Sequence, residues 1–335
     1  MFNHNAFLLE TITNTHVGAG DTNYGVIDNM IQRDSRSGFP VVHSSSLKGA
    51  IRDHFKQLSD ETIQNYTLEA VFGEESQERL NGLKQNSSDT DKQNIDFLLN
   101  KMPRQGLMKF FEANLLTLPL RSTKKVFHHA TCPYLALDYL ENLKQFKVVD
   151  NDDTNNLIRF FQHLRAKLSN VNTPFIVFSN ARPEIEDYEN GLSMAKDKAK
   201  EWDTFNYDSV RVQISKYFSP HQVDNYINAF AVFNDDLFQH ICTSGLPVIA
   251  RNKLSDKGTS ENLFYEEILP RRSVLWFMNG IYQFSADAPA GDFFQKQFAL
   301  VESQLQSQSI QIGANASVGY GVTSIHRING GKTDE

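Results

Sequence analysis

Apolar and polar residues follow two different periods along the first sixty residues of the chain. A short apolar run at 6–12 predicts a β-strand, and the glycine-dense stretch NTHVGAGDTNYG after it predicts a loop of turns. The apolar segment 25–33 predicts a second strand. A run of serines then precedes apolar side chains at helical spacing, which predict a helix with one buried face. These side chains are Leu47, Ile51, Phe55 and Leu58.

The rest of the chain continues to mix the two periods. Helical spacing predicts helices at 155–168, 223–241 and 293–306. Apolar runs bounded by turn residues predict strands at 174–178, 246–254, 309–312 and 322–328, and two more within 262–284 that a Pro-Arg-Arg turn joins. The polar tract 82–94 has no periodicity and predicts a mobile surface loop.

The order of these elements indicates the fold class. No repeat with a period between about 20 and 50 residues is visible, which argues against a solenoid. Strands and helices alternate in an order that predicts antiparallel sheets in an α+β fold of the ferredoxin-like (RRM-like) type, with large insertions. The 335 residues, 40% of them hydrophobic, can bury a substantial core. We expect a single domain over 1–335 with a disordered tail at 330–335.

Charge limits the partners that this chain can have. The 33 basic and 40 acidic residues give a formal net charge of −7, which excludes bulk attraction to nucleic acid of the histone kind. The charge is segregated, since 60–100 carries nine acidic and three basic residues, whereas 101–147 carries eight basic and three acidic residues. A nucleic-acid partner would therefore have to meet a local basic face.

Cysteine usage and hydropathy indicate the compartment. Cys132 and Cys242 are the only cysteines, which rules out a disulfide framework and a cysteine-based zinc cluster and fits a reducing environment. The N-terminus lacks a basic region followed by a long apolar run, and no stretch approaches about 18 uninterrupted apolar residues. We expect a soluble cytoplasmic protein without a membrane partner.

Three glycines punctuate the segment 313–321 near the C-terminus. Gly313, Gly319 and Gly321 would let the backbone approach a ligand closely and present N–H groups to phosphate oxygens. Their spacing matches neither a Walker motif nor a dinucleotide fingerprint, which argues against an ATPase or a Rossmann-type site. The alternative interpretation is a hairpin whose turn needs positive φ angles at several positions.

The start of the helix after the serine run is a second candidate for phosphate binding. Lys48 and Arg52 are four residues apart, so they share one side of this helix near its positive end. A phosphate would be bound there by both cations and by the serines at 44–46. Alternatively, the serines only cap the helix and the two basic residues are solvated.

Acidic residues provide the candidates for catalysis. Asp28 interrupts the apolar segment 25–33, where strand interiors disfavour aspartate, so it is a candidate general base or metal ligand, or else a turn-capping aspartate. His16 near the same turn could orient a substrate or be structural. Because adjacent strand residues point to opposite faces, only one of Glu266 and Glu267 can readily join a site, and the other would be a solvated charge.

Several of these segments together resemble a known family. The stretches THVGAG, GVIDNMIQRD, SGFP and SSLKGAIRDHF are similar to the N-terminal signature of the RAMP superfamily of CRISPR proteins. Five later blocks follow in family order and resemble the backbone subunits of type III-B (Cmr) effectors. These blocks span 113–122, 127–137, 246–254, 262–273 and 310–322. Only 60–100 and 148–235 lack a recognisable counterpart, and we expect both regions to be insertions or peripheral elements.

The resemblance implies an RNA-guided nuclease. Such a subunit multimerises along a CRISPR RNA (crRNA) beside other Cmr subunits and cleaves complementary target RNA at regular intervals. Asp28 would be the cleavage residue, assisted by a divalent metal, expected to be Mg²⁺, with His16 and Glu266 as further catalytic candidates. The S-L-K-G-x-x-R block and the glycine-rich loop would bind RNA. Their residues are Ser46, Lys48, Gly49, Arg52, Gly313, Gly319 and Gly321.

One departure from the family pattern removes an expected contact. Relatives commonly have Asp-Ala-Arg where this chain has Glu112, Ala113 and Asn114, so we do not expect a contact that relies on that arginine here.

The chemistry of the implied reaction is simple. A ribose 2′-OH attacks its neighbouring phosphorus, a step that needs in-line geometry more than an elaborate triad. An exposed aspartate is a poor base at neutral pH, so we expect Asp28 to hold a metal ion that activates the hydroxyl. Three alternatives stay open: a non-catalytic crRNA scaffold, a metal-independent guide-processing nuclease, and a small-molecule enzyme that binds a nucleotide at the glycine loop.

Overall fold

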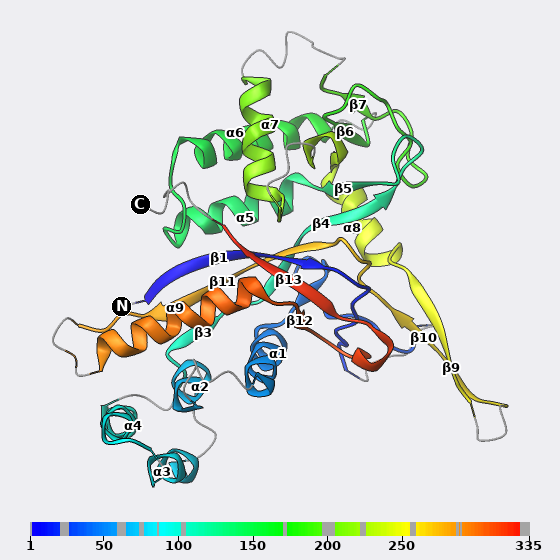
Figure 1. Ribbon diagram of the computed structural model, residues 1–335. Coiled ribbons are helices and arrows are strands. Elements are labelled where there is room, and N and C mark those ends of the chain that lie inside the picture. The colour runs from blue at the N-terminus through cyan, green and yellow to red at the C-terminus, as the bar shows by residue number, and fades with distance from the viewer. Residues whose placement is uncertain are drawn as a thin grey trace.

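The protein, described here from a computed structural model, combines a large sheet with helices on both of its faces (Figure 1). The structure describes residues 2–20, 27–58, 65–73, 77–85, 87–101, 105–169, 173–195, 205–221, 226–254, 259–285, 288 and 290–328. The predicted α+β class is confirmed, and the predicted disordered tail at 330–335 lies outside the described residues.

The secondary structure is as follows. The helices are α1 (Ser44–Gln57), α2 (Asn65–Phe72), α3 (Gln77–Gln85), α4 (Asp89–Lys101), α5 (Pro133–Gln145), α6 (Asp152–Leu168), α7 (Tyr207–Phe218), α8 (Asp235–Ser244) and α9 (Gly291–Ser307). The strands are β1 (Phe2–Thr11), β2 (Val41–Val42), β3 (Met108–Phe110), β4 (Ala113–Arg121), β5 (Phe127–Thr131), β6 (Phe175–Val177), β7 (Leu192–Ser193), β8 (Phe230–Phe233), β9 (Val248–Leu254), β10 (Ser260–Glu267), β11 (Val274–Tyr282), β12 (Ile310–Gln311) and β13 (Val322–Arg327).

Four long strands form the centre of the main sheet. Their order is β13-β1-β11-β4, and each strand is antiparallel to its neighbours. β1 and β11 pair without a break from Phe2↔Tyr282 to Glu10↔Val274. The helix α1 follows β1 in the chain and α9 follows β11, so each provides a crossover to the next strand of this central group.

The two faces of the central sheet bury different helices. Successive strand residues point to opposite faces, so Phe7 and Leu9 of β1 pack with α1 and α9, whereas Ala6 and Leu8 pack with α5, α6 and α7. All four side chains are at most 2% exposed. The helix predicted after the serine run is confirmed as α1, whose Leu47, Ile51 and Phe55 are buried against this sheet.

The sheet extends beyond its centre, and one hairpin leaves it. From β4 the sheet continues through β5, β8, β6 and β7, with β5 and β8 parallel. β9 and β10 pair only with each other among the described strands, and Figure 1 shows this hairpin projecting away from the body of the molecule. The base of the hairpin, where β10 ends, is the part that contacts the loops after β1.

Two of the predicted elements are wrong in type. The helix predicted at 223–241 is interrupted by β8, because its four residues lie between β5 and β6 and are fully buried on both faces. α8 begins only after this strand, where Asn234 caps it by accepting the N–H groups of Asp236 and Leu237. The described part of the segment 25–33 makes isolated bridges rather than a continuous strand.

The polar tract at 82–94 is not a loop. It contains the end of α3 and the start of α4, two helices that pack against each other. Leu80 of α3 and Ile95 of α4 are both buried in the main core. Asp89 and Asp91 in the first turn of α4 complement the positive end of that helix. The regions 60–100 and 148–235 hold whole helices of the fold, and their status as insertions stays a prediction.

No helix in the described part of the chain has both the length and the apolar character needed to cross a membrane.

Candidate functional site

Asp28 lies where the chain leaves the glycine-dense loop and meets the base of the β9–β10 hairpin. Its backbone N–H and that of Asn29 both donate to the Tyr265 carbonyl at 3.1 Å. Its carboxylate Oδ2 accepts the Tyr265 N–H at 2.7 Å, and its side chain is exposed. The backbone of β10 therefore holds an acidic group in place at the surface. Residues 21–26, which precede it, lie outside the described residues.

Glu266 is buried below this surface and surrounded by donors. Asn315 Nδ2 donates to both of its carboxylate oxygens, at 2.9 and 3.1 Å, and Arg251 Nε lies 2.7 Å from Oε2. His16 Nε2 lies 3.7 Å from Oε1. A carboxylate that is only 3% exposed needs such partners to stay charged. Glu266 thus anchors the glycine-rich loop and the hairpin to each other, and it is not an accessible acid.

His16 and Glu267 complete this buried layer. His16 is 4% exposed, and its Nδ1 donates to the Glu267 carbonyl at 2.7 Å, which places it in a structural position. Glu267 was predicted to be solvated if Glu266 joined a site, and this is wrong because Glu267 is 3% exposed. Its carboxylate pairs with Arg33 and accepts the Ile31 N–H. The segment that follows Asp28 covers β10 and buries both glutamates.

The three glycines of the loop 313–321 serve different purposes. Gly313, Gly319 and Gly321 have φ angles of 88°, 80° and 77°, in the left-handed region that favours glycine. A Cβ would lie 2.2 Å from a backbone oxygen at Gly313 and at Gly321, whereas at Gly319 it would meet nothing within 4 Å. Packing therefore accounts for the first and the last glycine. Gly319 lies at an exposed tip, where its N–H donates to the Ala316 carbonyl at 2.9 Å and where a ligand has room for a close approach.

Gln32 ties the start of α1 to the loop after β1. Its Nε2 donates to Ser46 Oγ at 2.9 Å and to the Gly18 carbonyl at 3.1 Å, and its Oε1 accepts the His43 N–H at 2.8 Å. α1 begins without a side-chain cap, so the interpretation that the serines only cap the helix is wrong. Its first-turn N–H groups keep their capacity to bind an anion.

The two basic residues predicted on α1 have different surroundings. Lys48 is half-buried, and this burial, together with the charge of Arg52, lowers its pKa. Arg52 Nη2 lies 3.3 Å from Oε2 of the buried Glu69 on α2, and its side chain is 17% exposed. Arg52 therefore joins α1 to α2. Gly49 is exposed, and a Cβ there would meet nothing within 4 Å.

The surroundings of Asp28 fit one kind of metal site. Among the described residues, a single group of His, Cys, Asp and Glu side chains brings three ligand atoms within 4.8 Å of one another, and Asp28 is not in it. Asp28 thus offers one carboxylate. Mg²⁺ commonly binds through one or two carboxylates together with substrate phosphates. The described residues fit a magnesium ion that Asp28 would hold together with a phosphate group, and among them there is no all-protein cage.

Sequence reasoning missed three residues that build this site. Asn315, in the left-handed region at a φ of 66°, could have been found, because asparagine tolerates that region better than most residues. Gln32 gave no signal, since its role depends on three partners from separate segments. Arg251, which also lies over the Tyr320 ring at 4.5 Å, becomes visible only when the hairpin is placed.

Comparison with known proteins places this arrangement in a family. The family model described as the RAMP superfamily matches residues 8–324. The chain belongs to the RAMP superfamily. Among this superfamily's known members, the CRISPR system Cmr endoribonuclease Cmr4 of Pyrococcus furiosus is 24% identical over 323 residues, which cover 95% of this chain and 93% of the relative.

Solved structures show the same RAMP fold. Oligomeric Cmr4 from Pyrococcus furiosus superposes with a TM-score of 0.62 at 18% identity, covering 98% of each chain. A chain of the type III-B Cmr-beta complex bound to cognate target RNA superposes with a TM-score of 0.66 at 18% identity, covering 97% of each chain. The family predicted from the sequence blocks is therefore confirmed, and the similarity to Cmr4 spans nearly the whole chain.

Proposed function

We propose that this chain is a backbone subunit of a type III-B CRISPR effector that binds crRNA along its length, multimerises on it and cleaves complementary target RNA. The exposed carboxylate of Asp28, fixed by the backbone of β10, carries this proposal. The acidic residues beside it, Glu266 and Glu267, are buried and neutralised by cations. Only Asp28 in this group presents a carboxylate to a ligand at the surface.

Binding of the guide RNA by this chain would be independent of the RNA sequence. A chain of net charge −7 can hold a polyanion only by concentrating donors on one face. Lys48 and the first-turn N–H groups of α1, up to Ser46, would supply such donors for phosphate oxygens. Gly49 and Gly319, where a Cβ would meet nothing within 4 Å, would let the RNA backbone approach closely. Arg52 pairs with Glu69, so we expect it to add to the positive potential around Lys48 more than to contact a phosphate directly. Base pairing with the guide would then specify the target.

The chemistry at Asp28 would be transesterification. The target 2′-OH attacks the adjacent phosphorus, and the 5′-oxygen leaves, which gives a 2′,3′-cyclic phosphate and a 5′-hydroxyl. Asp28 would bind a divalent metal, expected to be Mg²⁺, together with a phosphate oxygen; such an ion stabilises developing negative charge and promotes deprotonation of the hydroxyl. His16 and Glu266 would contribute by holding the loop 313–321 and the base of β10 rigid around the bound strand.

Partners and the finer fold follow from the same proposal. One relative is named as oligomeric and another lies in a complex with target RNA, which supports self-association along the guide and contact with other Cmr subunits. We expect the assembly to be cytoplasmic. We also infer that β1, α1, β4, β11, α9 and β13 form a ferredoxin-like core. Their antiparallel order β13-β1-β11-β4, with both crossover helices in one core layer, supports this.

The test is cleavage of a labelled RNA complementary to the guide. Complexes reconstituted with crRNA and Mg²⁺ are compared for the wild type, Asp28→Asn and the control Asp53→Asn, which alters an exposed aspartate on α1. We expect regularly spaced products from the wild type and the control, and at least about a 100-fold slower reaction with Asp28→Asn at unchanged guide binding. Unimpaired cleavage by Asp28→Asn would place the chemistry elsewhere, and uncut target in all three complexes would favour a scaffold.

A further inference from the structure

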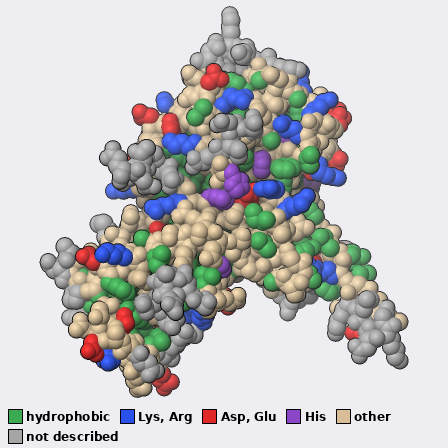
Figure 2. Space-filling model, in the orientation of Figure 1, with side chains coloured by type: hydrophobic (Ala, Val, Ile, Leu, Met, Phe, Trp, Pro, Cys, Tyr) green, Lys and Arg blue, Asp and Glu red, His purple; other side chains and the backbone are tan. Residues whose placement is uncertain are grey.

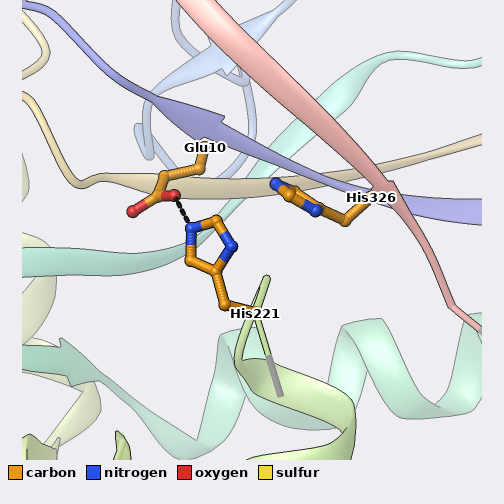
Figure 3. Close-up of side chains that lie close together, drawn as sticks. All are labelled: Glu10, His221 and His326. Carbon is orange, nitrogen blue, oxygen red and sulfur yellow. Dashed lines mark hydrogen bonds and ion pairs between the residues drawn. The ribbon is translucent and has the colours of Figure 1, made fainter. Parts of the chain in front are cut away.

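A second cluster of titratable side chains lies apart from the candidate RNA site. Glu10, His221 and His326 each offer one ligand atom, and these atoms lie within 4.8 Å of one another (Figure 3). We call this group the His-Glu cluster. Figure 2 shows histidine side chains gathered on the surface where the upper helices meet the sheet. The cluster shares no residue with the site built around Asp28.

The register of the sheet brings two members of the His-Glu cluster together. β1 and β13 are antiparallel, with Leu8 opposite His326 and Glu10 opposite Ser324. Directly opposed residues point to the same face, and Glu10 points to the same face as Leu8, so Glu10 and His326 are diagonal neighbours. That face is the one covered by α5, α6 and α7. The juxtaposition is therefore fixed by backbone pairing.

The third member comes from a different layer. His221 follows the end of α7, and its Nε2 lies 2.8 Å from Glu10 Oε2 (Figure 3). The His221 and His326 rings are 4.7 Å apart at their centroids. The Glu10 side chain is 3% exposed, whereas that of His221 is 49% exposed. An ion arriving from solvent would thus reach a buried carboxylate past a half-exposed imidazole.

The second oxygen of Glu10 is already oriented by an arginine. Arg272 Nη1 donates to Glu10 Oε1 at 3.0 Å, which leaves Oε2 as the oxygen that faces the histidines. Arg272 adopts a φ of 73°, a conformation that costs energy for a residue with a side chain, and its N–H bonds the Thr11 carbonyl. Ligating carboxylates are commonly held in this way by a further hydrogen bond.

We propose that Glu10, His221 and His326 bind a divalent transition-metal ion of the zinc class, with water as a fourth ligand. Two imidazoles and one carboxylate form a common zinc ligand set, and imidazole favours Zn²⁺, Co²⁺ and Ni²⁺ over Mg²⁺. Ligand atoms around such an ion stand roughly 3.3 Å apart, so the side chains must shift from the present arrangement, in which these atoms lie within 4.8 Å of one another. His326 Nε2, now 3.0 Å from Ser324 Oγ, would exchange that hydroxyl for the metal.

The bound ion would fasten the helical layer to the sheet. Its ligands come from β1, from β13 and from the third residue after α7. β1 and β13 pair through their backbones, whereas His221 reaches the sheet through its side-chain contact with Glu10. Because the three ligands meet only in the folded chain, binding would raise the free energy of unfolding. The role is structural and separate from RNA cleavage.

The first experiment uses Co²⁺ as a spectroscopic substitute for zinc. The full, untagged chain is stripped with a chelator and titrated with Co²⁺. We expect the visible absorption of tetrahedral Co²⁺ to saturate at one ion per chain, to disappear on addition of Zn²⁺ and to persist in excess Mg²⁺. His221→Ala and His326→Ala should abolish the absorption, whereas His240→Ala, which removes an exposed histidine of α8, should retain it.

The second experiment measures thermal unfolding of the same proteins. Zn²⁺ should raise the Tm of the wild type and of His240→Ala and leave the Tm of the two cluster variants unchanged. Both variants should unfold cooperatively without metal, which shows that they are folded. If His326→Ala does not fold, the result for His221→Ala, which alters a more exposed side chain, tests the proposal. Absence of the Co²⁺ absorption in the wild type, or its survival in His221→Ala, would overturn the proposal.

Discussion

The Asp28 carboxylate and the Tyr265 backbone N–H are joined by a hydrogen bond of 2.7 Å. An asparagine at position 28 can accept the same bond through its amide oxygen, so Asp28→Asn removes the charge and keeps the contact. This makes the substitution a test of charge rather than of structure. The neighbouring Glu266 could not be tested in the same way, because its charge balances Arg251 inside the protein.

The first prediction concerns removal of divalent cations. If Asp28 acts through a bound ion, chelation should slow target cleavage by the wild-type complex to about the rate of Asp28→Asn. Chelation of the Asp28→Asn complex should then have little further effect, because the two changes remove the same contribution and are not additive. Rates of target cleavage with Mg²⁺ and with excess chelator, for both proteins, give the complete cycle.

The same cycle distinguishes a metal role from a direct base. Two effects that multiply would mean that Asp28 and the cation contribute independently, and the proposed joint site would be wrong. Guide binding is measured in parallel under all four conditions, so that loss of the complex is not mistaken for loss of chemistry.

The second prediction separates Lys48 from Arg52. Lys48→Ala should weaken guide RNA binding and reduce the slope of log K against log salt concentration by about 1, because one phosphate contact is lost. Arg52→Ala should instead lower the Tm, since the buried Glu69 loses an ion-pair partner. Binding titrations at several salt concentrations and thermal unfolding measure both effects.

Lys92→Ala is the matched control, because Lys92 is a partly exposed lysine on α4 that pairs with Asp89. It should leave both the salt slope and the Tm close to those of the wild type. A salt slope unchanged by Lys48→Ala would remove Lys48 from the phosphate path.

The elements with strong local patterns could be predicted from the sequence. The helix α1 could be predicted from its apolar spacing because burial acts on one face of it. The strands β1, β9 and β13 were identified as apolar runs bounded by turn residues, although β1 is buried on both of its faces. β8 was assigned to a helix because its FAVF run is buried on both faces and carries no period. The helices α3 and α4 were missed because most of their side chains are polar and their burial depends on tertiary contacts.

The exposed residues of the candidate site could be predicted from the sequence, whereas the contacts of its buried residues could not. Asp28 and the glycines were visible as residues out of keeping with their surroundings. Glu267 was misjudged because nothing local shows that the segment after Asp28 covers β10 and delivers Arg33 to it. Glu10 and His326 are more than 300 residues apart in the chain, and only the register of β1 with β13 reveals their proximity.

The third prediction compares two glycines of one loop. Gly321→Ala places a Cβ 2.2 Å from the Ile312 carbonyl oxygen at a positive φ, so the backbone must shift, and we expect a loss of about 2 kcal/mol or more. Gly319→Ala meets nothing within 4 Å and should cost only the left-handed strain, about 1 kcal/mol. Denaturant unfolding of both variants measures the difference, and equal losses would contradict the assigned close approach.

The last prediction concerns acid stability and His128. His128 is 1% exposed on β5, and neither of its ring nitrogens has a hydrogen-bond partner among the described residues. Burial, with a smaller contribution from Lys125, lowers its pKa from 6.5 to about 4. Between these values the unfolded chain binds a proton that the folded chain does not. The free energy of unfolding must therefore fall as the pH drops from above 6.5 toward 4.

Replacement of His128 should remove this part of the pH dependence. The shift corresponds to at most about 3 kcal/mol, of which about 2 kcal/mol is lost by pH 5. Wild type should therefore lose about 2 kcal/mol more than His128→Leu between roughly pH 7.5 and pH 5, measured by urea unfolding. His240→Leu, at an exposed position, should behave like the wild type. A buried neutral imidazole at position 128 must contribute to the pH dependence of the free energy of unfolding. If His128→Leu keeps the full wild-type pH dependence, the acid sensitivity arises from other groups.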